Sequence, residues 1–580
     1  MAFESIFSDL YIYSRIMKGT GVTMEFIYIT GALIIAFIIK SIYDSKNNKE
    51  KVIAKLKKQW GEIPEQEYTS DNMISISSYY RSVQDDSYDV DDITWNDVSM
   101  DEIFMLMNNT SSSIGEEYLY SVLRKLKYND NDLKERNRLI EFFQHNSEKR
   151  LQLQVALRRM GKLRDISVYE YINLLENLDV TSNLPHYLMI IGLIGAIALI
   201  FFQPALGGFL TFTMVANNMI QYYRKKAKIE AYLSVCSYII RLLSCIKDFS
   251  NLNIPEVKEY ITQLEDASQK FNQFKKGARV VAGKNPNGDM FDIILDYERM
   301  LFHTDLIKFN SMLTCFKNNR DTLNNMFVTI GTLDSMIAVA SFRTMMDYYS
   351  LPELVSDRKP FIQAEELYHP MIDEPVTNSI MEDQCVLITG SNASGKSTFI
   401  KTLAINAILS QTIFTSMCKS YQASYFYVAS SMALQDNLLN KESYYIVEIK
   451  SLKRILDNIN AKVPTLCFVD EVLRGTNTLE RVAASSQILY SFSQANALCF
   501  AATHDIELTH ILENHYSNYH FQEQIADNNV LFDYKLQEGR AISRNAIKLL
   551  SVMGYSEHII DNATEAANQF LEEGNWYTIE

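Results

Sequence analysis

The sequence predicts an α/β domain at the C-terminal end of the chain, an all-helical region before it, and membrane-spanning helices inserted in that region. From about residue 360, short apolar runs at Cys385–Thr389, Thr465–Val469 and Ala497–Ala502 alternate with helical patterns. Such alternation is typical of a parallel sheet covered by helices on both faces. Between residues 98 and 350, apolar residues recur mostly at helical spacing. A long uncharged stretch, Val180–Tyr223, interrupts this region.

The uncharged stretch predicts a membrane hairpin. A membrane helix needs about 20 apolar residues, and Val180–Tyr223 has room for two such helices on either side of Pro204. We therefore expect helices at Tyr187–Phe202 and Ala205–Ile220, which form a transmembrane hairpin within residues 184–222. The alternative is a buried hairpin in the core of a large soluble protein, although core helices rarely lack charge on every face.

A second candidate for a membrane span lies near the N-terminus. Phe26–Ile39 is uncharged and has no small-residue cleavage site after it, so an uncleaved anchor fits better than a signal peptide. Several lysines follow between residues 46 and 58, which places that side in the cytoplasm by the positive-inside rule. The lysines could contact anionic lipid or form a solvated helix face. We expect a multi-pass protein of the cytoplasmic (plasma) membrane, with the C-terminal domain in the cytoplasm.

These patterns divide the chain of 580 residues into four parts. We expect an N-terminal anchor with a basic stretch at 1–60, a polar linker at 61–97, a helical region at 98–350 that carries the hairpin, and an α/β domain at 360–580. The net charge of −15 argues against strong sequence-independent affinity for nucleic acid. None of the seven cysteines forms a C-x-x-C pair, so we predict reduced core thiols and no zinc site.

The α/β region opens with a phosphate-binding motif. Residues Gly390–Ser397 read G-x-x-x-x-G-K-S between the predicted strand and a predicted helix at Ser397–Ile413. In this context Lys396 reaches the β- and γ-phosphates of a nucleoside triphosphate and the Ser397 hydroxyl ligates Mg²⁺. Backbone N–H groups of the loop cradle the phosphates. The predicted nucleotide-binding residues are Gly390, Ser391, Asn392, Ala393, Ser394, Gly395, Lys396, Ser397 and Thr398.

Acidic residues and a histidine follow the next two predicted strands. Asp470 ends one strand, where its carboxylate can hold the metal through the water shell. Glu471 comes next and can polarise the attacking water. His504 ends the following strand and could contact the γ-phosphate or orient the water, although a lone histidine is as often structural. The set predicts magnesium-dependent hydrolysis of the nucleotide.

Several of these segments resemble the MutS family of ATPases. Ile388–Thr398 resembles the family's ATPase loop, with an asparagine in third place. Asp470–Thr478 is similar to the family's D-E-x-x-R-G-T-x-T segment, and Ala502–His504 to its A-T-H strand end. Further similar segments are His369-Pro370, Asp436–Leu439, Ser443, Val447-Glu448 and the C-terminal stretch Tyr534–Ala563. The resemblance extends from Glu365 to about Phe570.

This resemblance implies a homodimer with composite ATP sites. One subunit would supply Lys396, Ser397, Asp470 and Glu471, and the other the segment around Ser443, so we include Ser443 with Glu471 and His504 among the catalytic residues. ATP binding would close the dimer and move helical lever arms. Membership would also imply DNA binding, as in mismatch repair proteins.

The sequence departs from the family in ways that put DNA in doubt. Lys441 stands in place of the family glycine before the serine, and Tyr444 in place of threonine after it. No mismatch-binding domain is recognisable, and the hairpin occupies the place of the family's DNA clamp.

Three functions therefore compete. The first is a membrane-anchored MutS-like ATPase that acts as a mechanical switch on a lipid or an unknown protein partner. The second is a tethered DNA sensor that binds through basic residues in the helical region. The third is an ABC-type transport ATPase, although no L-S-G-G-Q signature is present. The basic residues that would bind DNA in the second function are Arg158, Arg159, Lys162 and Arg164.

Overall fold

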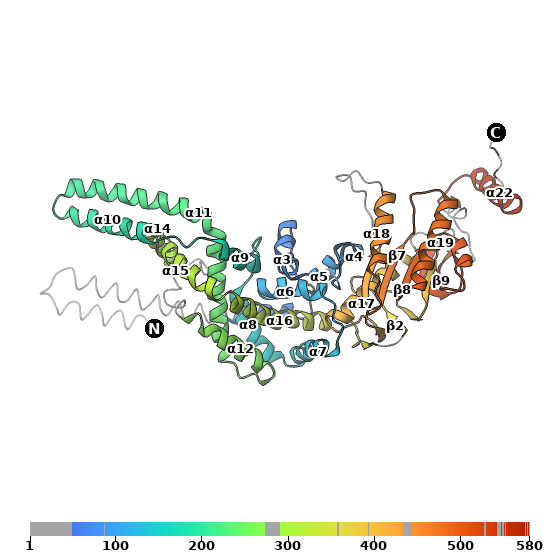
Figure 1. Ribbon diagram of the computed structural model, residues 1–580, viewed down its shortest axis with the longest axis horizontal. Helices are drawn as coiled ribbons and strands as arrows, with labels where there is room; N and C mark the ends of the chain where they lie inside the picture. Colours follow the sequence, from blue (N-terminus) through green and yellow to red (C-terminus); the bar gives the residue numbers. More distant parts are fainter. Residues whose placement is uncertain are drawn as a thin grey trace, which may run out of the picture.

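The computed structural model describes most of the chain after residue 48, as a helical body followed by an α/β domain (Figure 1). The described residues are 49–85, 88–272, 290–356, 359–391, 394–432, 444–526, 529–541, 547, 550–551, 553–574, 576 and 578. Four predictions fall outside them: the N-terminal anchor Phe26–Ile39, the loop residues Asn392 and Ala393, and Ser443.

The helical body is built around one long helix, α16, which is buried on nearly every face. Its middle turns bury Phe327, Ile330 and Leu333 completely. The helices of the body are α3 (Ser70–Val83), α4 (Asp92–Asp97), α5 (Met100–Met107), α6 (Ser113–Arg124), α7 (Asp130–His145), α8 (Ser147–Met160), α9 (Val168–Leu174), η1 (Leu175–Asn177), α10 (Leu184–Ile200), α11 (Pro204–Ser250), η2 (Pro255–Val257), α12 (Lys258–Gln269), α14 (Met290–Phe302), α15 (Thr304–Asn318) and α16 (Arg320–Met345).

The prediction of a linker at residues 61–97 is wrong, because two helices in this segment pack into the body. Helix α3 begins at a capping box in which Thr69 and Asn72 exchange side-chain and backbone hydrogen bonds. Its residues Tyr79 and Tyr80 are buried, as is Trp95 of α4. The many Ser, Asp and Tyr residues conceal an apolar face, since tyrosine rings contribute as much buried area as other aromatic side chains.

The predicted hairpin is present as a pair of helices, α10 and α11, joined at residues 201–203. It projects from the body (Figure 1). The second helix is longer than the predicted Ala205–Ile220: α11 is one continuous helix of 47 residues, from Pro204 to Ser250. Tyr222 is buried at the base of the hairpin, where its hydroxyl donates to Asp305 Oδ2 at 2.9 Å.

Two described helices are long and apolar enough to cross a membrane by length and composition alone, α11 and α16. The most apolar window of α16 is 83% buried inside the protein, so α16 reads as a core helix. The corresponding window of α11 is 56% buried. The hairpin leaves large apolar side chains exposed, among them Ile191 (65%), Phe209 (65%) and Phe212 (74%).

The α/β domain contains a six-stranded sheet of order β10-β9-β4-β8-β7-β6. Strands β4, β6, β7, β8 and β9 run parallel to one another, which confirms the predicted parallel sheet. The last strand, β10, pairs with β9 in antiparallel orientation. A smaller mixed sheet has the order β1-β5-β2-β3. The strands are β1 (Glu353–Val355), β2 (Ile362–Leu367), β3 (Asn378–Glu382), β4 (Cys385–Thr389), β5 (Ser420–Ser424), β6 (Tyr427–Ser431), β7 (Thr465–Asp470), β8 (Ala497–Thr503), β9 (Tyr516–Ala526) and β10 (Asn529–Glu538). The helices are α17 (Lys396–Thr412), α18 (Tyr444–Asn458), α19 (Thr478–Gln494), α20 (Ile506–Ile511) and α22 (Glu557–Glu573).

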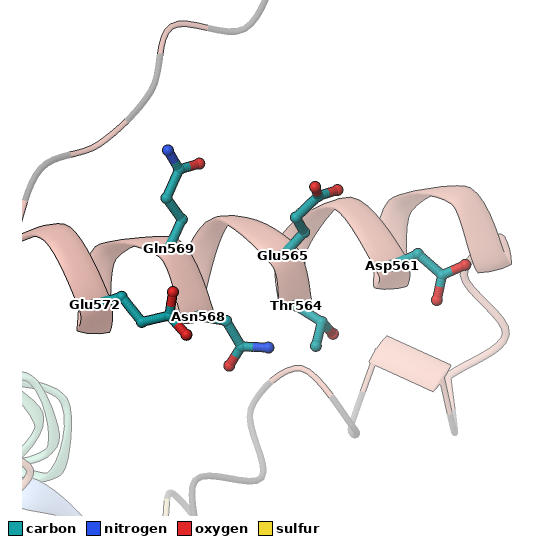
Figure 2. Close-up of a pocket in the computed structure, with 6 residues that line it drawn as sticks. All are labelled: Asp561, Thr564, Glu565, Asn568, Gln569 and Glu572. Carbon is teal, nitrogen blue, oxygen red and sulfur yellow. The ribbon is translucent and has the colours of Figure 1, made fainter.

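Helix α22 lies at the C-terminal end of the domain and presents an open, acidic groove (Figure 2). All residues that line the groove come from this one helix. No lysine or arginine is among them, so the groove is not suited to a nucleotide. They are Asp561, Thr564, Glu565, Asn568, Gln569 and Glu572.

The helical body and the α/β domain are joined by a buried arginine near the end of α16. Arg343 is 1% exposed, and its guanidinium donates to Thr415 Oγ1 at 2.8 Å and to the carbonyl oxygens of Ile413 at 3.2 Å and Phe414 at 2.9 Å. A further bond runs to Asn137 Oδ1 of α7 at 2.7 Å. Because α17 begins at the phosphate-binding loop and ends at Thr412, Arg343 ties the far end of that helix to the body.

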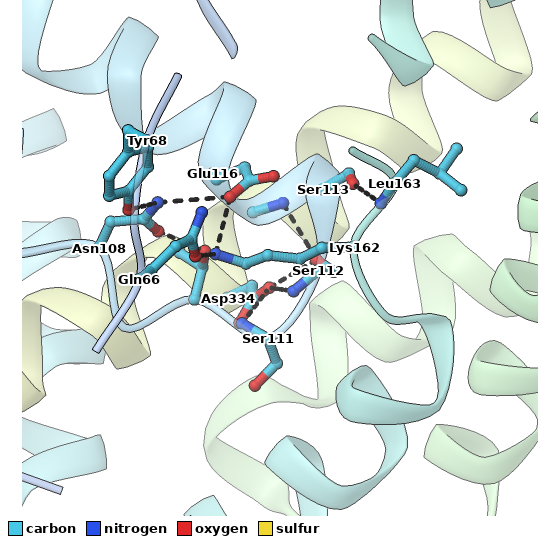
Figure 3. A network of polar contacts seen from close by, with 12 residues as sticks. Gln66, Tyr68, Asn108, Ser111, Ser112, Ser113, Glu116, Lys162, Leu163 and Asp334 are labelled. Atoms are coloured by element: carbon cyan, nitrogen blue, oxygen red, sulfur yellow. Dashed lines mark hydrogen bonds and ion pairs between the residues drawn. The ribbon is translucent and has the colours of Figure 1, made fainter. Parts of the chain in front are cut away.

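A buried carboxylate also fixes α16 to the start of α6 (Figure 3). Asp334 is fully buried and accepts hydrogen bonds from the backbone N–H groups of Ser111 at 3.0 Å and Ser112 at 2.9 Å. A Cβ atom at Gly115 would lie 2.1 Å from Asp334 Oδ2, so only glycine allows this approach. Burial raises the pKa of Asp334, and these donors oppose the shift.

Candidate functional site

The site lies where three parallel strands end at the same edge of the sheet. Thr389 of β4 pairs with Thr503 of β8, and Ala502 of β8 pairs with Asp470 of β7. The phosphate-binding loop therefore starts beside Asp470 and the residue that follows β8, His504. The carboxyl ends of parallel strands are where open α/β sheets bind ligands.

The glycines that bracket the loop have backbone conformations that other residues rarely adopt. Gly390 has φ +149° and Gly395 has φ +107°. A Cβ atom at Gly390 would lie 2.8 Å from the carbonyl oxygen of Phe521 and 2.9 Å from Ser394 Oγ. The loop can therefore approach strand β9 this closely only because position 390 has no side chain.

Lys396 begins α17 and folds back over its own loop. Its side chain is largely buried, and Nζ donates to the carbonyl oxygens of Gly390 at 2.8 Å and Ser391 at 2.7 Å. Burial lowers the pKa of Lys396 to about 8, while the carboxylates of Asp470 and Glu523 act in the opposite direction. A desolvated ammonium among backbone dipoles is suited to bind a phosphate oxygen.

Ser397 and Asp470, which the sequence predicts as metal ligands, lie in direct contact. The Ser397 hydroxyl donates to Asp470 Oδ2 at 2.5 Å, and these residues come from the start of α17 and the end of β7. The other oxygen, Asp470 Oδ1, is buried and has no hydrogen-bond partner within the described part of the chain. An unpaired carboxylate oxygen beside a hydroxyl fits Mg²⁺, which prefers oxygen ligands and keeps several of its waters. Among the described residues no group of three or more His, Cys, Asp or Glu side chains could hold a metal, so phosphates and water would have to complete the shell.

Glu471 stands at the turn after β7 in a left-handed conformation with φ +54°. Its N–H donates to the Ala502 carbonyl at 3.0 Å, and its Oε1 lies 2.9 Å from His504 Nε2. The second oxygen is paired with Arg474. Burial lowers the pKa of His504, and the positive charges of Lys396 and Arg474 lower it further. The imidazole is therefore neutral near pH 7 and can donate one hydrogen bond to Glu471.

Helix α18 supports the loop that carries Glu471. Glu448 of α18 is buried and accepts a hydrogen bond from the N–H of Leu473, a residue with φ +59°. A Cβ atom at Gly475 would lie 2.8 Å from Tyr445 Cβ. Ser443, one residue before α18, is outside the described residues, but the helix that follows it packs directly against the Asp470–Thr478 segment.

The structure thus brings together the described members of the predicted site. One side of the site is formed by the loop and the start of α17, with Gly390, Ser391, Ser394, Gly395, Lys396 and Ser397. The other side is formed by the ends of β7 and β8, with Asp470, Glu471 and His504. Thr398 lies in the first turn of α17 and has an exposed side chain. Sequence reasoning missed Glu523 of β9, whose Oε2 accepts a hydrogen bond from Ser391 Oγ at 3.0 Å. Nothing local in the sequence marks Glu523, because its contact depends on how β9 lies beside β4.

Comparison with known proteins gives a consistent picture for the C-terminal part of the chain. Residues 386–571 match the family model of MutS domain V. The chain is 26% identical over 312 residues to the DNA mismatch repair protein MSH3 of Debaryomyces hansenii, which covers 48% of this chain and 30% of that protein. It is 27% identical over 252 residues to the DNA mismatch repair protein MutS of Natronomonas pharaonis, 41% of this chain and 28% of that protein. It is also 27% identical over 296 residues to human MutS protein homolog 4, 47% of this chain and 31% of that protein. The chain thus spans less than a third of the length of each of these relatives.

Proposed function

Because the chain belongs to the MutS family through its C-terminal domain, we propose that it is a magnesium-dependent ATPase whose site lies at the carboxyl ends of β4, β7 and β8. Proteins of this family are ATPases in general. The observation that carries the proposal is the contact of Ser397 with Asp470 at 2.5 Å beside the buried Lys396. Two motifs far apart in the sequence thus meet in the arrangement that nucleotide hydrolysis requires.

Each residue of the site has a defined task in this proposal. Lys396 and the loop N–H groups bind the phosphates, and Ser397 and Asp470 hold Mg²⁺. The bound metal neutralises charge that develops on the phosphate oxygens. Glu471 orients the attacking water and accepts its proton, after Arg474 has released the carboxylate. His504 fixes the orientation of Glu471 through the 2.9 Å contact.

We further propose that the protein works as a homodimer with composite sites, in which the partner subunit's Ser443 completes the site. Members of this family act as dimers and bind DNA. Nucleotide binding at the start of α17 would shift the end of that helix, which Arg343 ties to α16. The helical body would act as the lever that carries this movement to the hairpin.

The exposed apolar hairpin supports a membrane as the place of action. Side chains such as Phe209 and Phe212 would contact lipid, because an apolar surface of this kind is unfavourable in water. We place the protein in the cytoplasmic membrane, with the ATPase domain in the cytoplasm, where ATP is. The partner on which the lever acts would be lipid or another membrane protein.

DNA remains the second candidate, because two relatives are DNA mismatch repair proteins by name. Two of the four basic residues expected to bind DNA argue against it. Arg159 is paired with Asp248, and Lys162 lies 2.7 Å from the buried Glu116. Both are thus engaged within the protein. The match to MutS domain V also favours this type of ATPase over an ABC-type transporter.

The test is the ATPase rate of the full-length protein in detergent with Mg²⁺, alone and with homoduplex, mismatched and branched DNA over a salt series. We expect a basal rate that Lys396→Ala reduces by about a hundredfold or more and that no DNA changes. A rate stimulated by DNA and lost steeply with salt would favour the DNA sensor, since phosphate contacts release counterions. Equal rates for the wild type and Lys396→Ala would refute the proposed site.

A further inference from the structure

We propose that Glu523 determines the nucleotide affinity of this site: its carboxylate positions the phosphate-binding loop through Ser391 and opposes the charge of the incoming phosphates. The inference rests on the proposed ATPase function and adds a residue that neither the motifs nor the family resemblance indicated. Two observations carry it, the placement of Glu523 behind the loop and the charges around Lys396.

Strand β9 brings Glu523 to the loop. In the pairing of β9 with β4, Tyr519 lies beside Ile388 and His520 beside Thr389, the last residue of β4. Glu523 comes three residues further along β9, at the level of the loop. Its side chain is only 6% exposed, and its Oε2 accepts the hydrogen bond from Ser391 Oγ at 3.0 Å.

The loop is held on both sides in this arrangement. Ser391 donates to Glu523 through its hydroxyl, and its carbonyl oxygen accepts from Lys396 Nζ at 2.7 Å. Lys396 therefore turns towards the loop backbone rather than outward. In the absence of a phosphate, Glu523 is one of two negative charges near the ammonium, and Asp470 has the larger effect.

When a triphosphate is bound, the negative charge of Glu523 becomes unfavourable. Once phosphates neutralise Lys396, Glu523 is a buried negative charge next to a multiply charged anion, and the two repel. Solvent screens the repulsion poorly, because the carboxylate is nearly inaccessible. The expected consequence is weaker nucleotide binding and faster nucleotide release than the loop alone would give.

A second carboxylate, which contacts the same strand from β3, provides a matched control. Glu382 of β3 accepts hydrogen bonds from Ser517 Oγ at 2.9 Å and Tyr519 OH at 2.8 Å, both on β9. Glu382 contacts β9 as Glu523 does, but its partners Ser517 and Tyr519 pair with Val386 and Ile388, within β4 and before the loop begins. Loss of charge at Glu382 thus tests a general effect on β9.

The experiment compares Glu523→Gln with Glu382→Gln in full-length protein. The dissociation constant for Mg²⁺ and the non-hydrolysable β,γ-imido analogue of ATP is measured by titration calorimetry. Glutamine keeps an acceptor for Ser391 and removes the charge, so we expect Glu523→Gln to bind about tenfold more tightly and Glu382→Gln to bind as the wild type does. Glu523→Ala serves as a second neutral variant of different shape, and the same direction is expected.

The outcomes are distinct. Equal or weaker binding by both neutral variants would overturn the inference while the ATP site stands. If the wild type binds the analogue no better than Lys396→Ala does, the proposed function itself fails, and this inference with it. Tighter binding by Glu382→Gln as well would assign the effect to β9 in general and overturn the role of Glu523.

Discussion

The contacts of Arg343, which connect α16 to the segment after α17, predict the effect of removing this side chain. Truncation of this side chain in Arg343→Ala removes four hydrogen bonds, to Asn137, Ile413, Phe414 and Thr415. The Phe414 carbonyl loses this donor, which costs about 1–3 kcal/mol for a buried group. Two buried methylene groups, Cγ and Cδ, are lost at about 0.8 kcal/mol each. Part of this is offset, because burial of the guanidinium is itself unfavourable and lowers the pKa of Arg343 to about 10.

We therefore expect the segment after α17 to be destabilised by about 3 kcal/mol. A chain with several domains has no single free energy of unfolding, so the assay is amide hydrogen exchange, read on the peptide that contains Ile413, Thr415 and Ser416. Their N–H groups donate to Leu409 and, for Ser416, to Ser350. Protection of these amides should fall by about a hundredfold.

The matched control is Arg320→Ala on the same helix. Arg320 lies 2.7 Å from Glu176, and both side chains are about half exposed. Loss of such a surface pair costs about 0–1 kcal/mol, so protection near Ile413 should not change. The reasoning about Arg343 would be refuted if the amide hydrogens of this peptide exchanged in Arg343→Ala at the wild-type rate, or no faster than in Arg320→Ala.

Two further predictions concern the dimer and the hairpin. If the sites are composite, Lys396→Ala and Ser443→Ala are each inactive alone, but an equal mixture recovers about a quarter of the wild-type rate, because one site of each mixed dimer is intact; no recovery would place both residues in one subunit's site. If the hairpin spans the membrane, Phe209→Glu with Phe212→Glu should release a chain that starts at residue 49 from the membrane fraction, since each charge costs about 2.5–3.5 kcal/mol at the centre of a membrane helix. A chain with Gln203→Glu in the turn should stay bound, and retention of the double variant would argue for a buried or surface-bound hairpin.

The sequence predicted the parts of the site that depend on local pattern. The loop Gly390–Ser397 and the strand end at Asp470 are contiguous motifs, and parallel strands place their carboxyl ends at one edge, so the contact between Ser397 and Asp470 followed. The helical hairpin was likewise predictable from the absence of charge over Val180–Tyr223. Whether it lies in a membrane stays a prediction.

Features that depend on packing between distant segments could not be predicted in this way. Glu523 reaches Ser391 only through the register of β9 on β4, a contact across 132 positions of the sequence. The supposed linker contains α3, whose buried face includes Tyr79 and Tyr80 among many polar residues. The buried contact of Tyr222 with Asp305 of α15 likewise depends on packing, because the two residues are 83 positions apart.

The central claim is that the site binds ATP and uses Glu471 to hydrolyse it. The most direct measurement compares ATP binding and single-turnover hydrolysis in the wild type and in Glu471→Gln, in full-length protein with Mg²⁺. The side chain of Glu471 contacts His504 and Arg474 rather than the residues that hold the nucleotide, so the variant should keep the wild-type affinity for ATP. Its hydrolysis should be slower by about a hundredfold or more. Hydrolysis at the wild-type rate in Glu471→Gln, or a wild type that does not hydrolyse ATP, would contradict the account.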